Sequence, residues 1–181
     1  MSVFGWIIIH QHLGYTFNWN LSWADYKAGF GDIGADFWLG LEKMHLLTSS
    51  QPYRLRVEVQ QNSTNLWYSA EYWSFKIGDE LNDKYRLKVS GYSGDAGDSL
   101  MYKGGGGRYK HNGMKFTTYD QDNDKWNGNN CASSRCGGWW YKACNKCCLT
   151  CSCNLRHYWS TMATDTADKR ARNSRMMIKP N

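Results

Sequence analysis

Proline and long hydrophobic runs are scarce in this chain of 181 residues. There are two prolines, and the longest apolar run, Trp6 to Ile9, is far shorter than the ~20 residues that a membrane-spanning helix needs. The first residues also lack the basic stretch, apolar stretch and cleavage site of a secretory signal peptide. We therefore predict no membrane span, and if the protein is extracellular, either its export is signalled elsewhere or the chain is a fragment.

Acidic residues are fewer than basic ones: the chain has 16 acidic and 22 basic residues, which give a formal net charge of +6. Such an excess of cations can serve to neutralise nucleic-acid phosphates. However, charges of both signs are interspersed up to about Asp98, and the densest basic stretch, residues 169–179, lies at the C-terminal end. We therefore predict no nucleic-acid partner and interpret this stretch as a solvated basic tail.

Cysteine is missing from the first two thirds of the chain, and all seven cysteines fall within residues 131–153. Because seven is odd, one thiol is expected to be free, to bond another chain or to bind a metal. The pairs Cys144/Cys147 and Cys148/Cys151 have the two-residue spacing of ligands to zinc or to an iron–sulfur cluster. The alternative, which we favour, is disulfide bonding in an oxidising compartment.

Two triplets match the acceptor motif for N-glycosylation, at Asn20 and at Asn62. Glycosylation at such a motif requires a surface loop in a secreted protein. Both asparagines are therefore glycosylation candidates, and they agree with an extracellular location.

What the chain has in abundance is aromatic side chains and glycine: 10 Trp, 12 Tyr, 6 Phe and 18 Gly. The clearest strand is Tyr53 to Val59, where apolar and charged residues alternate. Alternation returns in Leu66 to Tyr72 and Tyr85 to Val89, and Trp6 to His10 is also strand-like. Together these segments predict an antiparallel sheet with short connections, followed by a loop-rich second half.

Two short helices are predicted in the first third of the chain. Ser22 and Asp25 form a capping-box pattern that begins the first helix, and Gly29 can end it. The second helix is expected around Glu42 to Leu47. The elements therefore predict an α+β fold.

An acidic loop follows, in which Asp120, Asp122 and Asp124 occupy alternate positions. Alternate side chains of a loop can converge on a calcium ion while backbone carbonyls complete its shell of oxygen ligands. The loop is not an EF-hand, because Lys125 and Cys131 occupy the positions that would require Gly and Glu. The alternative to a calcium site is an acidic turn that bonds to its own backbone.

Many segments, in order and with good coverage from about residue 5 to 145, resemble the fibrinogen C-terminal domain family of fibrinogens, ficolins, tachylectins, angiopoietins and tenascins. The segments are Gly5-Trp6, Trp23-Ala24-Asp25-Tyr26-Lys27-Ala28-Gly29-Phe30-Gly31, Phe37-Trp38-Leu39-Gly40-Leu41-Glu42-Lys43-Met44-His45, Tyr85-Arg86-Leu87, Ser90-Gly91-Tyr92-Ser93-Gly94, Gly97-Asp98-Ser99-Leu100, His111-Asn112-Gly113-Met114-Lys115-Phe116-Thr117-Thr118-Tyr119-Asp120 and Gly137-Gly138-Trp139-Trp140-Tyr141.

The resemblance implies one α+β domain over residues 1–181, mainly an antiparallel sheet with short helices and a loop-rich calcium- and ligand-binding subdomain. The family's N-terminal subdomain is expected to be missing. Residues 144–174 are predicted to be a divergent, Cys-rich and basic segment.

The same resemblance assigns calcium as the cofactor. It implies ligation by the carboxylates of Asp122 and Asp124 and the backbone carbonyls of Trp126 and Gly128. It also implies a disulfide between Cys131 and Cys144, a bond that would close the loop beside the calcium site.

A ligand site is implied next to this disulfide. In lectin-like members, the peptide bond before the second cysteine is often cis, and the adjacent pocket accepts an acetyl group. Here that bond joins Ala143 and Cys144, and the implied ligand-binding residues are Tyr141, Ala143, Cys144 and Asn145. Asn145 stands where the family usually has His.

These assignments predict a secreted, calcium-dependent recognition module of the innate-immune type that binds carbohydrate or acetylated ligands. One alternative is an adhesive or structural domain that binds other proteins, and another is a Cys-rich zinc-binding module. A surface thiol would also allow a homo-oligomer. We expect no enzyme, because the histidines, His10, His12, His45, His111 and His157, are scattered and are predicted to be surface or packing residues.

Overall fold

The alternating segment that begins at Tyr53 forms a long strand, β5 (Tyr53–Gln61), as its pattern predicts. Leu55, Val57 and Val59 are buried on its inner face, whereas Arg56 and Glu58 point outward. A strand with one apolar and one charged face lies between a core and water, and this one organises the molecule. The structure is a computed structural model, and it describes residues 2–3, 5–14, 17–153, 157–162 and 167–181.

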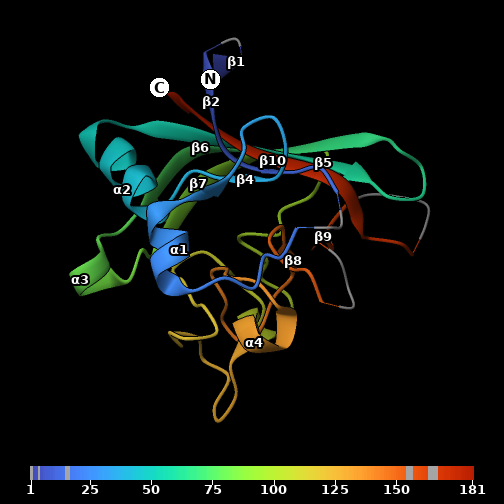
Figure 1. Ribbon diagram of the computed structural model, residues 1–181. Coiled ribbons are helices and arrows are strands. Elements are labelled where there is room, and N and C mark those ends of the chain that lie inside the picture. The colour runs from blue at the N-terminus through green and yellow to red at the C-terminus, as the bar shows by residue number, and fades with distance from the viewer. Residues whose placement is uncertain (1, 4, 15–16, 154–156, 163–166) are drawn as a thin grey trace.

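The sheet around β5 is antiparallel, and its strand order is β3-β4-β2-β10-β5-β6-β7, with β1 paired to β2 at the side. Figure 1 shows the sheet as one layer and the loops of the second half as the other. The remaining strands of the sheet are β1 (Ser2–Val3), β2 (Trp6–His12), β3 (Phe30–Gly31), β4 (Phe37–Trp38), β6 (Trp67–Ile77), β7 (Leu87–Gly94) and β10 (Ala171–Pro180). The predicted antiparallel sheet is thus confirmed.

Strand β10 corrects one expectation, because the basic C-terminal stretch is not a solvated tail. It lies in the middle of the sheet, hydrogen-bonded to β2 on one side and to β5 on the other. Met176 and Ile178 are buried, while the guanidinium of Arg175 faces outward and pairs with Glu58 at 2.5 Å. The charges therefore lie along the outer face of a central strand.

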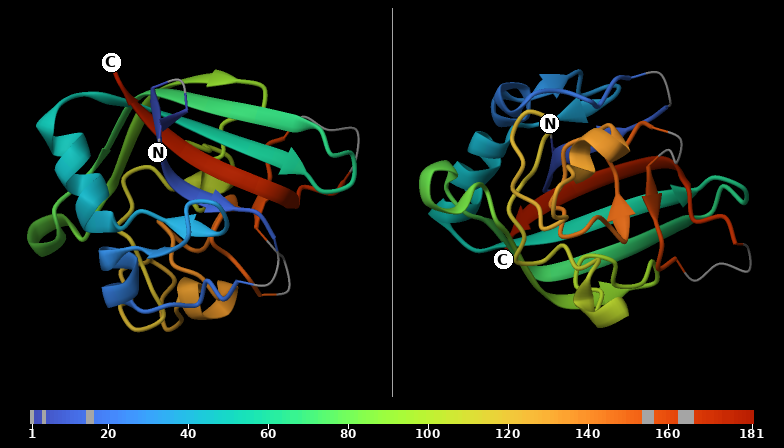
Figure 2. Two further views of the ribbon diagram at one scale, coloured as in Figure 1. Left: turned by 45° about the horizontal axis from the view of Figure 1, so that its top comes forward. Right: turned by 90° about the horizontal axis from the view of Figure 1, so that it is seen from below.

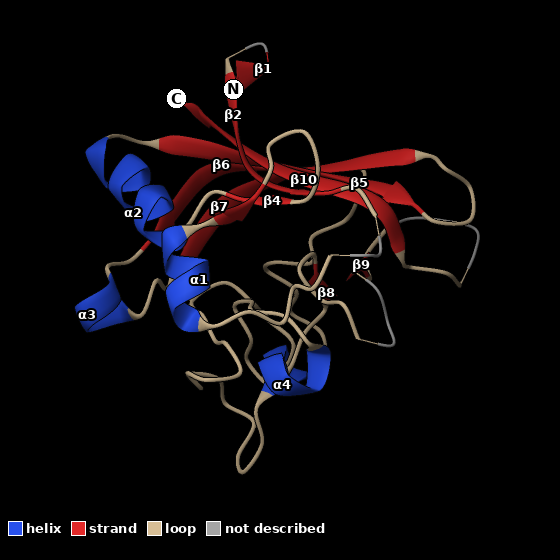
Figure 3. Ribbon diagram, in the orientation of Figure 1, coloured by secondary structure: helices blue, strands red, loops and turns tan. Residues whose placement is uncertain are grey.

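Two helices flank one end of the sheet (Figure 3). Helix α1 (Trp23–Ala28) begins with the predicted capping box, in which Ser22 and Asp25 bond to each other's backbone N–H, and ends at Gly29 with φ of 96°. Helix α2 (Leu41–Ser50) is longer than expected at both ends. The short helices are α3 (Glu80–Asp83), α4 (Cys131–Arg135) and the 3-10 turn Gly105–Gly107.

Residues 95–153, 157–162 and 167–170 form a second layer, here called the loop subdomain, which covers one face of the sheet (Figure 2). It has little regular structure, and its small sheet pairs β8 (Cys147–Cys148) with β9 (Tyr158–Trp159). Aromatic side chains take part in the hydrogen bonds that fix it to the first layer: Trp140 donates its ring N–H to Tyr85 O at 2.7 Å, and Gly138 N donates to Tyr26 Oη at 3.0 Å. The polar atoms of the aromatic rings thus position the loops as well as filling the core.

The architecture confirms the expected α+β class, mainly an antiparallel sheet with few short helices. None of the helices in the described residues is long and apolar enough to cross a membrane.

Candidate binding site

The acidic loop is organised around Asp124. Its two carboxylate oxygens accept the backbone N–H groups of Trp126 and Cys131, each at 2.7 Å, and Asp122 in turn accepts the N–H of Asp124 at 3.0 Å. Burial raises the pKa of Asp124, and the neighbouring Asp122 carboxylate raises it further. Asp120 lies apart from this pair, because its carboxylate accepts the N–H of Trp23 at the start of α1 at 2.9 Å.

The oxygen donors of this loop suit a hard cation. Asp122 is exposed and the chain then turns back through Gly128, whose φ is 76°. Carboxylate and carbonyl oxygens are the ligands that calcium takes, and a cation would relieve the repulsion between Asp122 and Asp124. Among the described residues no three His, Cys, Asp or Glu side chains gather around a metal position, so a cation here would also need the implied carbonyls of Trp126 and Gly128.

The implied disulfide is present in the structure, and Cys131 and Cys144 have Cα atoms 5.4 Å apart. Cys131 also donates its N–H to Asp124, so the bond joins the acidic loop directly to the segment around Cys144. The peptide bond between Ala143 and Cys144 is cis. The sequence thus brings the acidic loop and the implied ligand segment together, as the resemblance required.

The implied ligand residues do not all reach the surface. Tyr141 is completely buried and donates its hydroxyl to Gly137 O at 2.7 Å, Cys144 is buried, and Asn145 is 9% exposed. Tyr141 therefore supports the loop from behind and cannot touch a ligand in this conformation. Ala143 is partly exposed, and Arg108 donates to its carbonyl at 3.2 Å.

His111 supports the same segment, a role that the sequence did not reveal. Its Nδ1 lies 2.8 Å from Trp140 O, and its Nε2 lies 3.0 Å from the backbone N of Lys146 and 3.2 Å from that of Cys147. A carbonyl can only accept and an N–H can only donate, so the ring is neutral with its proton on Nδ1. Burial lowers the pKa of His111 to about 4. Only its contacts across the fold distinguish it from the other histidines.

The cysteines are paired rather than available for zinc. Two further disulfides join Cys136 to Cys153 and Cys148 to Cys151, and Cys147 is the free thiol that the odd number required. Six bonded cysteines leave no thiolate set for zinc. Cys147 is buried, so it offers no surface thiol for linking subunits.

The surface of the loop subdomain carries an excess of cations. Residues 103–146 hold eight lysines and arginines against three aspartates. Lys142 and Lys146 flank the cis segment, where Lys142 Nζ donates to Gly107 O at 3.0 Å and Lys146 Nζ lies 4.4 Å from the centre of the Tyr102 ring. The segment around Ala143 therefore has a cationic rim.

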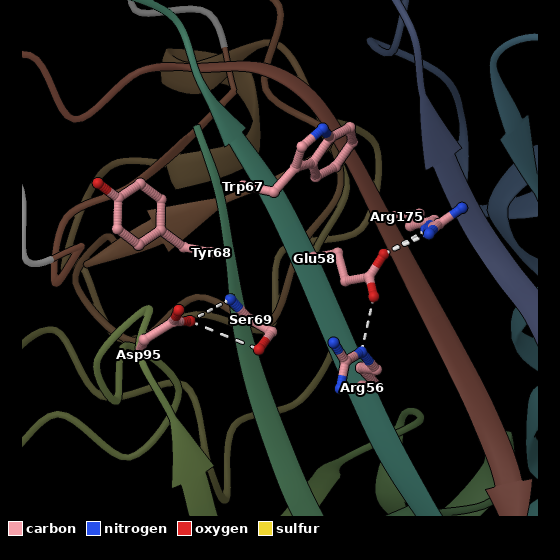
Figure 4. Close-up of a pocket in the computed structure, with 7 residues that line it drawn as sticks. All are labelled: Arg56, Glu58, Trp67, Tyr68, Ser69, Asp95 and Arg175. Atoms are coloured by element: carbon pink, nitrogen blue, oxygen red, sulfur yellow. Dashed lines mark hydrogen bonds and ion pairs between the residues drawn. The ribbon is translucent and has the colours of Figure 1, made fainter. Parts of the chain in front are cut away.

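A hollow lies on the outer face of the sheet, and Figure 4 shows the residues that line it: Arg56, Glu58, Trp67, Tyr68, Ser69, Asp95 and Arg175. There Glu58 accepts from Arg56 at 2.6 Å and from Arg175 at 2.5 Å, while Trp67 is 48% exposed. The two guanidiniums are already neutralised by carboxylates, so this hollow has less free charge to offer a partner than the cationic rim.

The two glycosylation candidates differ in setting. Asn20 is exposed and follows the buried Trp19. Asn62 lies in the turn between β5 and β6, where its side-chain Nδ2 donates to Asp168 at 3.3 Å. Asn20 is the more accessible of the two acceptors.

A family model described as the C-terminal globular domain of fibrinogen beta and gamma chains matches residues 2–180. The chain belongs to this fibrinogen C-terminal domain family. It is 43% identical over 143 residues to Fibrinogen-like protein A of Apostichopus parvimensis, covering 77% of this chain and 47% of that protein. It is 42% identical over 139 residues to Angiopoietin-related protein 1 of Bos taurus, covering 77% of this chain and 26% of that protein. The chain therefore spans less than half the length of these relatives.

Solved structures of fibrinogen-like domains also match nearly the whole of this chain. The fibrinogen-like globe domain of human ANGPTL2 matches with a TM-score of 0.84 and 35% identity over 98% of this chain and 81% of that one. A lamprey fibrin D-dimer complexed with the peptide ligand Gly-His-Arg-Pro-amide matches with a TM-score of 0.86 and 30% identity, over 97% of this chain and 61% of that one.

The role of His111 predicts a loss of stability in acid. Its pKa is about 4 in the folded protein against 6.5 for an ordinary histidine. Between these two values the ring is protonated in the unfolded chain but neutral in the folded protein. The contribution of His111 to the free energy of unfolding is fully present above pH 6.5. It falls by about 3 kcal/mol as the pH drops towards 4.

Urea unfolding of the wild type and of His111→Gln over this pH range checks the expectation. The variant is expected to be less stable at neutral pH, with a pH dependence that is smaller by about 3 kcal/mol. Parallel pH profiles for the two proteins would contradict the role assigned to the ring.

Proposed function

We propose that this chain is an extracellular, non-catalytic protein-binding domain that uses the loop subdomain to hold an acidic surface of its partner. The observation that carries the proposal is the cationic rim around the cis Ala143–Cys144 segment, which the Cys131–Cys144 disulfide fixes in place. The fibrin structure that it resembles was complexed with a peptide, which supports a peptide or protein as the class of ligand. That peptide carries an arginine and no carboxylate, so the acidic character of the partner proposed here rests on the cationic rim alone.

The cations of the rim are held in position before any partner arrives. Arg108 donates to Ala143 O, Lys142 donates to Gly107 O, and Lys146 lies over the ring of Tyr102. Long side chains that are already ordered lose less conformational entropy on binding. An acidic partner would be attracted over a distance and then find preformed charges, so binding should weaken as salt is added.

An extracellular location is supported by the three disulfides, since such bonds persist in oxidising compartments. A binding role without catalysis is supported by the histidine closest to the site. Both ring nitrogens of His111 are hydrogen-bonded to backbone groups, so the ring has no free nitrogen to act as a general base.

Calcium is proposed as the ion that completes the acidic loop. Asp122 and Asp124 would supply carboxylates and Trp126 and Gly128 would supply carbonyls, next to the N–H of Cys131 that anchors the disulfide. In this loop the backbone N–H of Lys125 donates to Lys142 O at 2.6 Å. By stabilising the loop, the ion would therefore help to hold the rim in place.

A carbohydrate or acetylated ligand remains the second candidate, for one specific reason. Asn145 is buried next to the cis bond, and its Oδ1 has no hydrogen-bond partner among the described residues. A buried acceptor without a partner is costly, and the N–H of an acetamido group would satisfy it once a local movement of the segment exposed the oxygen.

The first test measures binding of a hexaglutamate peptide and of N-acetylglucosamine to the purified chain in calcium. The double variant Lys142→Glu/Lys146→Glu is expected to bind the peptide about tenfold more weakly, which is about 1.4 kcal/mol. Lys76→Glu, an exposed lysine of β6 away from the loop subdomain, is the control and should bind like the wild type.

Equal peptide binding by the rim variant and the control would overturn the proposed surface. Binding of the sugar without the peptide, lost in Asn145→Ala, would favour the carbohydrate candidate instead.

The calcium proposal is tested by thermal unfolding with calcium and with a chelator. A ligand at 100 times its dissociation constant stabilises the native state by about 2.7 kcal/mol, so calcium should raise the melting temperature of the wild type. Asp122→Ala should remove most of this increase and change little in chelator, because Asp122 is exposed. The ion would be excluded if the melting temperature of the wild type were the same with calcium and with chelator. It would also be excluded if Asp122→Ala lowered the melting temperature equally in both conditions.

A further inference from the structure

Asparagine is followed by glycine at two places in the chain, Asn112-Gly113 and Asn127-Gly128. Glycine has no Cβ, so its main-chain nitrogen can approach the side-chain amide of the residue before it without a steric clash. An attack of this nitrogen on the amide carbon is the first step of asparagine deamidation. By sequence the two pairs are equivalent, and the structure separates them.

Asn112 is kept from this reaction by hydrogen bonds. Its side-chain oxygen accepts the N–H of Val89 and its side-chain nitrogen donates to Val89 O, both at 3.1 Å. The main-chain N–H of Gly113 donates to Leu87 O at 2.8 Å. Both reacting groups are therefore bonded to strand β7, and the nitrogen can reach the amide carbon only if these bonds break.

Asn127 lacks these restraints. It is exposed, and neither its side-chain amide nor the main-chain N–H of Gly128 forms a hydrogen bond to a described residue. The pair lies at the centre of a β-turn, which Asn129 closes by donating its N–H to Trp126 O at 3.0 Å. Gly128 has φ of 76°, as the third residue of a type II turn requires. A methyl group on Gly113 or Gly128 would meet no described atom within 4 Å, so the pairs differ in hydrogen bonding and not in space.

We propose that Asn127 deamidates in the folded protein while the fold protects Asn112. The nitrogen of Gly128 bonds to Cγ of Asn127, the bond between Cγ and Nδ2 breaks, and ammonia leaves with the proton of the glycine N–H. Water then opens the resulting cyclic imide at one of its two carbonyls. Opening at the side-chain carbonyl gives aspartate, and opening at the main-chain carbonyl gives isoaspartate, whose main chain is one carbon longer. Both products replace a neutral amide with a carboxylate.

The acidic loop has little freedom to accommodate the longer main chain of isoaspartate. The carboxylate of Asp124 accepts the N–H of Trp126 with one oxygen and the N–H of Cys131 with the other, each at 2.7 Å. One side chain therefore holds both ends of the short span over residues 127–130. An extra main-chain carbon has to be taken up inside this span, so the turn is the part that changes.

The consequence for calcium rests on the proposed function, in which the carbonyl of Gly128 is one of the ligands. The aspartate product keeps the length of the main chain and adds a negative charge to the loop, so calcium can still bind. The isoaspartate product displaces the Gly128 carbonyl from the carboxylates of Asp122 and Asp124. Calcium is therefore expected to stabilise the aspartate product and not the isoaspartate product.

Peptide mapping of protein kept for weeks at neutral pH and body temperature tests the reaction without any ligand. Trypsin places the two pairs on separate peptides, residues 111–115 and 126–135. Because two side-chain hydrogen bonds restrain Asn112, Asn127 is expected to convert at least about tenfold faster in the folded protein. In urea the two rates should be similar, because the fold no longer restrains either pair. Asn127→Gln is the control, since the longer side chain cyclises far more slowly, and its peptide should stay unconverted.

The proposal is overturned if the folded protein converts both asparagines at the same rate, converts Asn112 faster, or leaves Asn127 intact. It is also overturned if Asn127→Gln shows the same conversion in the 126–135 peptide, because the reaction would then lie at another residue of that peptide.

Thermal unfolding of the separated products tests the effect on the loop. Asn127→Asp is the matched control, because it adds the charge without lengthening the main chain. Calcium should raise the melting temperature of Asn127→Asp about as much as that of the fresh wild type, whereas the isoaspartate form should lose most of this increase. An isoaspartate form that responds like the wild type would contradict the displacement of the Gly128 carbonyl. A fresh wild type without any response would reject the proposed calcium site and leave the conversion rates of the two asparagines as they were measured.

Discussion

The central constraint on this molecule is the place of its last strand. Strand β10 pairs with β2 on one side and with β5 on the other, so the C-terminal end is fixed in the middle of a sheet that the first half of the chain builds. Residues 95–170 must therefore leave the sheet after β7 and return to its centre. A long excursion with both ends fixed can be irregular and still be held in one place, because the ladders at its ends position it.

Within that excursion, order comes from specific bonds rather than from regular elements. The Cys131–Cys144 disulfide joins the acidic loop to the cis segment, His111 satisfies the backbone N–H groups that follow, and Trp140 and Tyr26 tie the loops to the sheet layer. Each of these hydrogen bonds buries a polar group with its partner. The exposed groups that remain around Ala143 are mostly cationic, which is why a protein ligand with acidic side chains is the partner proposed here.

The parts of the fold that the sequence predicted are those with a local cause. The capping box of α1 and the alternation of β5 are complete within a few residues, and both are present as expected. Strand β10 was missed because its charges suggested a tail, and only pairing with β2 and β5 shows that one face is buried. The histidines were predicted to be surface or packing residues, and His10, His12 and His111 are buried packing residues. Which of them are buried could not be predicted, because their burial depends on residues far away in the chain. The disulfide and the cis bond could be expected from family resemblance, whereas the burial of Tyr141 could not.

Mapping the disulfides by mass spectrometry of the nonreduced protein tests most directly whether this covalent frame holds the loop subdomain. The account predicts peptides that link Cys131 to Cys144, Cys136 to Cys153 and Cys148 to Cys151, with Cys147 labelled by an alkylating reagent only after denaturation. A peptide that joins Cys131 or Cys144 to any other cysteine, or a Cys147 thiol that reacts in the native protein, would contradict it.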